Sequence, residues 1–167
     1  MILIGGGSRS GKSRTALEML KGCGPRQGFI ATAHAWDDEM RDRIARHREE
    51  RDPAITTWEE GTRVADRIQA EEGRYDGIVV DCLTLWLSNV ILTESTTLEA
   101  ECSKLLDAAD TVRTRIILVT NEVGCGIVPE NALARRFRDE AGKLNQMAAQ
   151  RASEVYWMVF GIRMRIK

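Results

Sequence analysis

The chain has 167 residues, and 24 lysines and arginines against 25 aspartates and glutamates give a formal net charge of -1. This length fits one domain, expected over residues 1–167, and 43% hydrophobic residues are typical of a globular protein. The balanced charge argues against a dedicated nucleic-acid-binding protein, while two histidines and four cysteines without a CxxC pair exclude a histidine metal cluster and a zinc module.

Short apolar runs alternate with longer polar stretches along the chain. Continuous apolar character predicts strands buried on both faces, at Ile2–Gly5, Gly28–Thr32, Gly77–Asp81, Arg115–Thr120, Val155–Phe160 and Ile162–Ile166. Helical periodicity predicts helices over Ser13–Lys21, Asp37–Glu50 and Asn131–Ala152. The alternation predicts an α/β fold of the P-loop NTPase-like kind, with a mostly parallel sheet flanked by helices.

The sequence also predicts how three further stretches are placed in the fold. One stripe of the third helix should pack on the core through Leu133, Phe137, Ala141, Leu144 and Ala148. The polar residues 93–97 predict a loop within a helical region, and the apolar stretch Leu83–Leu92 suits either core or interface. No apolar run approaches the ~18 residues of a membrane span, and the apolar start lacks the positive flank of a signal peptide. Scattered thiols favour the cytoplasm.

The strongest motif follows the first predicted strand and opens the first predicted helix. It fits GxxxxGK[ST] through Gly6, Gly7, Ser8, Arg9, Ser10, Gly11, Lys12 and Ser13. Backbone N–H groups of such a loop converge on phosphate oxygens, Lys12 would reach the β- and γ-phosphates, and Ser13 would bind Mg²⁺. The alternative is a glycine-rich turn without a ligand.

Asp81 ends a predicted central strand, and parallel sheets bind ligands beyond the carboxyl ends of their strands. We therefore predict that Asp81 helps to hold the metal ion; the alternative is a turn aspartate. Thr120–Val123 also follows a strand but lacks the lysine and aspartate of a guanine-specific motif, which weakens a GTPase-switch hypothesis. Within it, Asn121 and Glu122 are candidates for substrate or metal contact, or parts of a structural loop.

His47 continues the apolar stripe of Met40 and Ile44 and is flanked by Arg46 and Arg48. Neighbouring cations disfavour the imidazolium and would keep a neutral, nucleophilic ring. The alternative is a packing or surface histidine, which is also our interpretation of His34. Three arginines of the last helix (Arg135, Arg136 and Arg138) are expected to form a solvated face.

Four stretches together resemble one family: GGGSRSGKSR, IATA with DDEMRDRI, VVDCLTLWLSN, and NEVGCGIVPEN with FRDEAGKLNQ. This is the bifunctional adenosylcobinamide kinase/adenosylcobinamide-phosphate guanylyltransferase family of cobalamin biosynthesis, and the resemblance runs from Met1 to Lys167. It implies phosphorylation of adenosylcobinamide with ATP or GTP, followed by GMP transfer from GTP onto that phosphate. The products are adenosylcobinamide-GDP and pyrophosphate, and Mg²⁺ is the implied cofactor.

The resemblance also implies roles for individual residues. The family's guanylylated histidine corresponds to His47, whereas the histidine that often precedes it is replaced by Arg46. Implied nucleotide contacts beyond the phosphate loop are Ala31, Thr32, Ala33, Arg48, Glu49, Glu50, Arg51, Glu59 and Asp81. A homo-oligomer, specifically a trimer, is implied as well. Two alternatives remain: a kinase-only P-loop enzyme on a small hydroxylated substrate, and a nucleotide-dependent switch protein.

Overall fold

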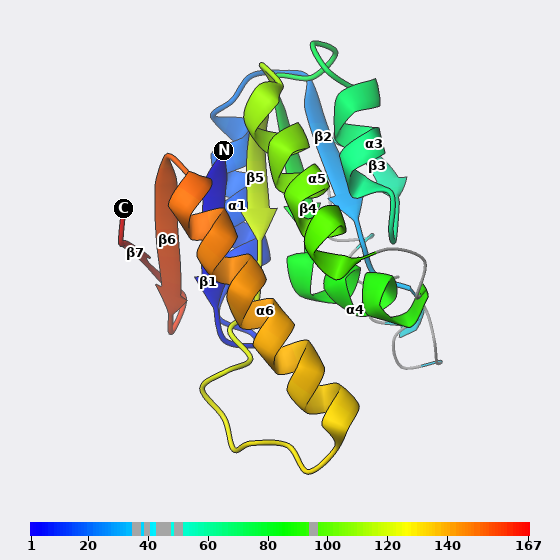
Figure 1. Cartoon of the computed structure of the whole chain (residues 1–167). Helices are drawn as coiled ribbons and strands as arrows, with labels where there is room; N and C mark the ends of the chain where they lie inside the picture. Colours follow the sequence, from blue (N-terminus) through cyan, green and yellow to red (C-terminus); the bar gives the residue numbers. More distant parts are fainter. Residues whose placement is uncertain (35–37, 39–40, 43–47, 49–51, 94–96) are drawn as a thin grey trace.

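A computed structural model describes residues 1–34, 38, 41–42, 48, 52–93 and 97–167. A seven-stranded sheet in the order β3-β2-β4-β5-β1-β6-β7 forms its centre (Figure 1). The strands are β1 (Ile2–Gly6), β2 (Gln27–Ala31), β3 (Thr56–Glu59), β4 (Gly77–Asp81), β5 (Arg115–Val119), β6 (Glu154–Val159) and β7 (Ile162–Arg165). Neighbouring strands are parallel except for β6 and β7, so the predicted α/β fold with a mostly parallel sheet is confirmed.

Strands β1, β2, β4 and β5 are buried along nearly their whole length, as continuous apolar runs require. All six predicted strands form, and no bound shifts by more than one residue. The predicted burial is wrong for β7, which pairs antiparallel with β6 at the edge of the sheet and is exposed along its whole length. Strand β3 was not predicted. It is a short edge strand with exposed ends and a half-buried middle, so its four residues carry little of the apolar signal that marks the others.

Helices cover both faces of the sheet (Figure 1). They are α1 (Lys12–Lys21), α3 (Val64–Ala70), α4 (Leu83–Thr93), α5 (Leu98–Thr111) and α6 (Ala132–Arg151). Alternate residues of one strand serve the two cores. Leu3 packs in the cluster that contains α3, α4, α5 and α6, whereas Ile2 and Ile4 pack with Ala16 and Leu20 of α1. None of the helices within the described ranges is long and apolar enough to cross a membrane.

Helix α6 confirms the predicted helix, with Asn131 as its N-cap: the Asn131 side chain accepts a hydrogen bond from the N–H of Ala134. The predicted stripe is confirmed from Phe137 onwards and is wrong at Leu133. Ala141, Leu144 and Ala148 are buried and Phe137 is half-buried against the core, but Leu133 is 50% exposed. In Figure 1 the first turns of α6 extend beyond the ends of the strands, and they lie beside α4 rather than over the sheet.

The remaining helix predictions have different outcomes. The predicted helix Ser13–Lys21 is α1, and most of the apolar stretch Leu83–Leu92 is buried in α4 as core. Helix α4 ends at Thr93 and α5 begins at Leu98, while residues 94–96 lie outside the described residues. Most of the predicted helix 37–50, including His47, also lies outside them.

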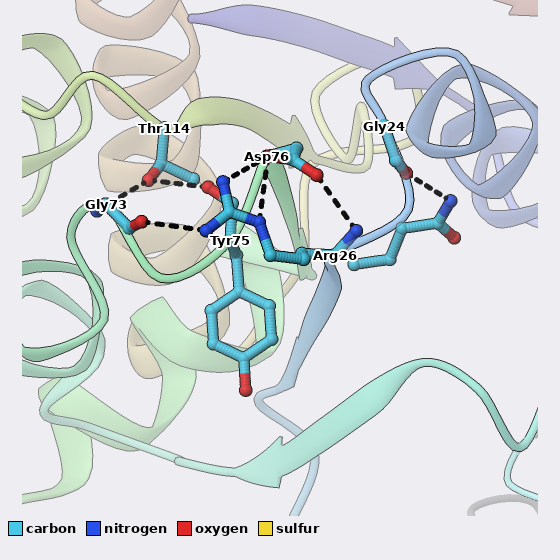
Figure 2. Close-up of polar contacts among 7 residues, drawn as sticks. Gly24, Arg26, Gly73, Tyr75, Asp76 and Thr114 are labelled. Carbon is cyan, nitrogen blue, oxygen red and sulfur yellow. Dashed lines mark hydrogen bonds and ion pairs between the residues drawn. The ribbon is translucent and has the colours of Figure 1, made fainter.

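Side-chain hydrogen bonds tie the amino ends of the central strands together (Figure 2). Arg26, which precedes β2, donates to the carboxylate of Asp76, which precedes β4, through its backbone N–H and two guanidinium nitrogens. Thr114, just before β5, donates to the carbonyl of Tyr75 and accepts from the N–H of Gly73. The bonds from Arg26 lower the pKa of Asp76. This end of the sheet is therefore joined by structural contacts.

Candidate functional site

Residues Gly7–Gly11 connect β1 to α1 at the opposite, carboxyl end of the sheet. Gly6 has φ +151°, and a Cβ there would lie 2.8 Å from the carbonyl oxygen of Met158. Gly11 has φ +94° at the N-cap of α1. Glycine alone meets both demands, which explains its place in this loop. The first N–H groups of α1 point out of the helix end and have no intrahelical acceptor, as an anion-binding site needs.

Lys12 is the first residue of α1 and is only 7% exposed. Its Nζ donates to the carbonyl of Gly7, 2.6 Å away, and lies 3.5 Å from Oγ of Ser10. The cation therefore folds back over the loop that would surround a phosphate. Ser13, next along the helix, is half-buried at the same helix end. Lys12 and Ser13 therefore both lie at the helical end of the loop to which the sequence assigns phosphate binding.

Asp81 is the last residue of β4 and is half-buried. In the sheet it pairs with Ala31 of β2 on one side and with Val119 of β5 on the other. Because β5 also pairs with β1, exactly one strand separates β4 from the strand that leads into the phosphate loop. Asp81 and Lys12 therefore lie at the same end of the sheet, on either side of the end of β5.

The chain that leaves β5 fills the space between them. The N–H of Glu122 donates to the carbonyl of Gly6, which holds this segment beside the phosphate loop. The Nδ2 of Asn121 donates to Oγ1 of Thr84 in α4, 2.9 Å away. The structure therefore places both Asn121 and Glu122 at the carboxyl end of the sheet, next to the phosphate loop.

Asn145 of α6 supports the same segment, and the sequence reasoning did not single it out. Thr120, 2% exposed, donates from its hydroxyl to Oδ1 of Asn145 at 2.7 Å, and Nδ2 of Asn145 lies 3.3 Å from the carbonyl of Asn121. A usable signal existed: Asn145 is a polar residue next to Leu144 on the buried side of an amphipathic helix. Such a residue needs a polar partner, because an unpaired buried group is costly.

The chain leaving β2 is bound to the chain leaving β4. The hydroxyl of Thr32, fully buried, donates to the carbonyl of Cys82 and accepts from its N–H, at 2.8 and 2.7 Å. The N–H of Thr32 donates to the carbonyl of Asp81. Ala31 and Ala33 flank this residue, Ala31 buried and Ala33 half-buried. The side chain of Thr32 therefore serves an internal contact between strand ends.

Glu59 ends β3 at the same edge, and its carboxylate lies 3.6 Å from Nη1 of Arg48. Both side chains are largely exposed, so the pair adds little stability. The pair nevertheless places Arg48 at the carboxyl end of the sheet. The other predicted site residues of this stretch lie outside the described residues: His47, Glu49, Glu50 and Arg51.

Ser13 and Asp81 offer oxygen atoms at this end of the sheet. Among the described residues, no group of three or more histidine, cysteine, aspartate and glutamate side chains could hold a metal ion unaided. A hydroxyl from Ser13 and a carboxylate from Asp81 are instead what Mg²⁺ takes from a protein when phosphate oxygens and water complete its shell. The arrangement suits phosphate chemistry on a nucleoside triphosphate.

Comparison with known proteins gives a consistent result. Residues 2–166 match the family described as cobinamide kinase / cobinamide phosphate guanyltransferase. The chain is 45% identical over 168 residues to the bifunctional adenosylcobalamin biosynthesis protein CobP of Pseudomonas aeruginosa PAO1, covering 99% of this chain and 96% of the relative. It is 39% and 38% identical over 181 residues to the bifunctional CobU proteins of Salmonella typhimurium LT2 and Escherichia coli K12, covering 100% of this chain and 99% of each relative.

Proposed function

The chain belongs to the cobinamide kinase / cobinamide phosphate guanyltransferase family, and we propose that its residues 1–167 form one domain that performs both reactions at a single nucleotide site. It is an enzyme of adenosylcobalamin biosynthesis that phosphorylates cobinamide and transfers a guanylyl group to the product. The observation that carries the single-site proposal is the phosphate loop, flanked by the polar ends of β4 and β5.

In the kinase reaction, the hydroxyl of the aminopropanol arm of adenosylcobinamide attacks the γ-phosphorus of ATP or GTP. The bond from that phosphorus to the bridging oxygen breaks, and a nucleoside diphosphate leaves. Lys12 and the backbone N–H groups of the loop stabilise charge on the phosphate oxygens, which is the main catalytic demand of such a transfer. Ser13 and Asp81 would hold Mg²⁺, whose charge when bound neutralises phosphate oxygens.

In the guanylyltransferase reaction, neutral His47 attacks the α-phosphorus of GTP. A phosphorus–nitrogen bond forms and pyrophosphate leaves, so one difficult transfer becomes two displacements. A phosphate oxygen of adenosylcobinamide phosphate then attacks the same phosphorus, releases His47 and gives adenosylcobinamide-GDP. The placement of Arg48 beside Glu59 supports this role, since Arg48 follows His47 in sequence and lies at the catalytic end of the sheet.

The remaining nucleotide contacts are proposed at the same end. Ala31 and Ala33 lie where β2 ends, and Glu59 and Asp81 end β3 and β4. For Thr32, whose hydroxyl is engaged with Cys82, the proposed contribution is to shape the site rather than to offer a free hydroxyl. Arg48, Glu49, Glu50 and Arg51 complete the proposed set around His47.

We propose a homo-oligomer, a trimer by family resemblance, located in the cytoplasm. Exposed apolar side chains on and around β7 support an interface: Phe160 is 94% exposed, and Ile162, Met164 and Ile166 are each more than half exposed. A second set lies in the loop before α6 and in its first turn, where Ile127, Val128 and Leu133 are 97%, 60% and 50% exposed. Exposed apolar side chains in groups are typical of contacts between subunits.

Two labels on GTP test the reaction with His47. The α-labelled nucleotide, but not the γ-labelled one, should leave label on the protein through an acid-labile bond. His47→Ala should abolish the label, and His34→Ala is the matched control that should retain it. Full labelling of His47→Ala would refute the assignment. Kinase turnover with no α-label on the wild-type protein would support a kinase-only enzyme, and nucleotide hydrolysis without corrinoid-stimulated turnover would support a switch.

A further inference from the structure

Asn89 of α4 is a buried polar residue, 5% exposed, that lies behind the carboxyl end of the sheet. Its Nδ2 donates to two backbone carbonyls, that of Thr32 and that of Gly61, each at 2.9 Å. Thr32 directly follows β2, and Gly61 comes two residues after the end of β3. One amide nitrogen therefore joins the exits of two neighbouring strands.

Thr32 and Gly61, which supply the two carbonyls, lie in segments that make further hydrogen bonds to neighbouring strand ends. Thr32 is bonded to Asp81 through its N–H and to Cys82 through its hydroxyl. The N–H of Glu60, next to Gly61, donates to the carbonyl of Ala31. The ends of β2, β3 and β4 are therefore joined in one network in which Asn89 is the side chain shared by β2 and β3.

Asparagine fits this position for a chemical reason. Both acceptors are carbonyl oxygens, so the residue must supply two N–H donors from one nitrogen, as a carboxamide does. Aspartate has the same shape but offers oxygen lone pairs to the two carbonyls, which would repel them. The space beside Asn89 is also tight, because a Cβ on Gly61 would lie 3.1 Å from Nδ2 of Asn89 and 2.6 Å from Nε2 of His34.

The phosphate loop is held by different contacts. Its strand β1 pairs with β5 and β6, and the N–H of Glu122 donates to the carbonyl of Gly6. None of these bonds passes through Asn89. A change at Asn89 therefore acts first on the exits of β2 and β3, and leaves Lys12 and the phosphate loop in place.

We propose that Asn89 is a positioning residue for guanylyl transfer. By holding Thr32 and Gly61 together it fixes the exits of β2 and β3 relative to Asp81, and Glu59 at the end of β3 contacts Arg48, the residue that follows His47. This inference rests on the proposed role of His47. It predicts a selective effect: loss of the two hydrogen bonds impairs attack on the α-phosphorus far more than transfer of the γ-phosphate.

The test compares both reactions in Asn89→Asp, with Ser88→Ala as the neighbouring control on α4. For Asn89→Asp we expect the rate of α-labelling and the guanylyltransferase kcat to fall about tenfold or more, while the kinase kcat stays within about threefold of wild type. The ratio of the two activities is the decisive readout, since a merely structural role would lower both together. Ser88→Ala should leave the ratio unchanged.

Gly61→Ala provides a second route to the same contact if Asn89→Asp does not fold. Its new methyl group presses on Asn89 and His34, so it should lower the same ratio in the same direction. Equal loss of both activities in the folded variants, or no loss of either, overturns the inference. If the wild type and Asn89→Asp are both fully labelled, this inference is refuted and the proposed function is not. If the wild type is not labelled, the proposed function is refuted and this inference with it.

Discussion

The ammonium nitrogen of Lys12 lies 2.6 Å from the carbonyl oxygen of Gly7, five residues earlier in the same loop. The side chain thus spans the phosphate loop from its helical end to its start. A phosphate entering the loop would meet a cation already held over the site, which reduces the reorganisation needed on binding. This contact makes Lys12 the first residue to test.

Lys12→Met keeps the length of the side chain and removes its charge. We expect kinase kcat to fall at least about 100-fold, because the developing charge on the phosphate oxygens loses a preorganised cation. Steady-state kinetics with ATP and GTP measure this. Lys21→Met, at the exposed far end of α1, is the matched control and should behave as wild type.

Asp81→Asn should raise the Mg²⁺ concentration needed for half-maximal kinase activity and lower kcat by about 100-fold, because a neutral amide is a poorer ligand than a carboxylate. Folding should survive, since the contact with Thr32 uses the backbone carbonyl of residue 81. A magnesium titration of activity measures both effects. An unchanged magnesium dependence would remove Asp81 from the metal site, and Asp110→Asn at an exposed position of α5 controls for charge alone.

Asn145→Ala should lower the free energy of unfolding by about 1–3 kcal/mol, because it leaves the buried hydroxyl of Thr120 without its acceptor. Urea denaturation measures the change, with exposed Gln146→Ala as the neighbouring control. Combining Thr120→Val with Asn145→Ala removes both partners. The double variant should therefore lose less stability than the sum of the two single variants, and simple additivity would show that the hydrogen bond contributes nothing.

The four cysteines should differ in their reaction with iodoacetamide. Cys125 is exposed and should react first in the native protein, whereas Cys82 and Cys102 are buried. Burial raises the pKa of the Cys102 thiol to about 11, so that little reactive thiolate forms near pH 8. Mass spectrometry of native and urea-unfolded protein measures the order. Because the folded protein disfavours the Cys102 thiolate, stability should also decline as pH rises from about 9 to about 11.

Lowering the pH should reveal how much the Arg26–Asp76 pair contributes to the stability of the folded protein. Hydrogen bonds from Arg26 lower the pKa of Asp76, so the folded state favours the charged carboxylate. The stabilisation is present above the ordinary carboxyl pKa and is lost as pH falls through the lowered folded value. Asp76→Asn should therefore flatten the acid side of the stability curve measured by thermal unfolding. A variant that loses stability with acid as steeply as wild type would show that other carboxylates dominate.

The strands, and the strand–loop–helix arrangement around residues 6–13, are the parts that the sequence predicts well. Both follow from local rules: β1 is continuously apolar and leads into a loop whose glycines have φ values that other residues rarely adopt. Edge strand β3 has neither an apolar run nor a glycine signal, so these local rules do not predict it. The exposure at the start of α6 is not predicted either, because periodicity predicts which face is apolar but not how far the sheet beneath it extends.

The supporting residues of the site were harder to predict. Asn89 and Asn145 act through contacts with strand ends that are distant in sequence, such as the 2.9 Å contact from Asn89 to the carbonyl of Gly61. No local pattern encodes which carbonyls a buried amide will meet, since that depends on how β2, β3 and β4 are ordered in the sheet. Strand order is a long-range property, and the spacing of motifs along the chain does not specify it.

Strand β5 separates the two strands whose ends carry the predicted phosphate loop and Asp81. Neighbouring strands lie ~4.8 Å apart, so the backbone ends of β1 and β4 are separated by about 10 Å. A ligand held by both must therefore lie across the end of β5, beside the segment that carries Asn121 and Glu122. In the proposed site, one Mg²⁺ between Ser13 and Asp81 bridges this gap together with the phosphates. We therefore expect the nucleotide and its metal ion to bind as one complex, because each half of the site is completed only by the other.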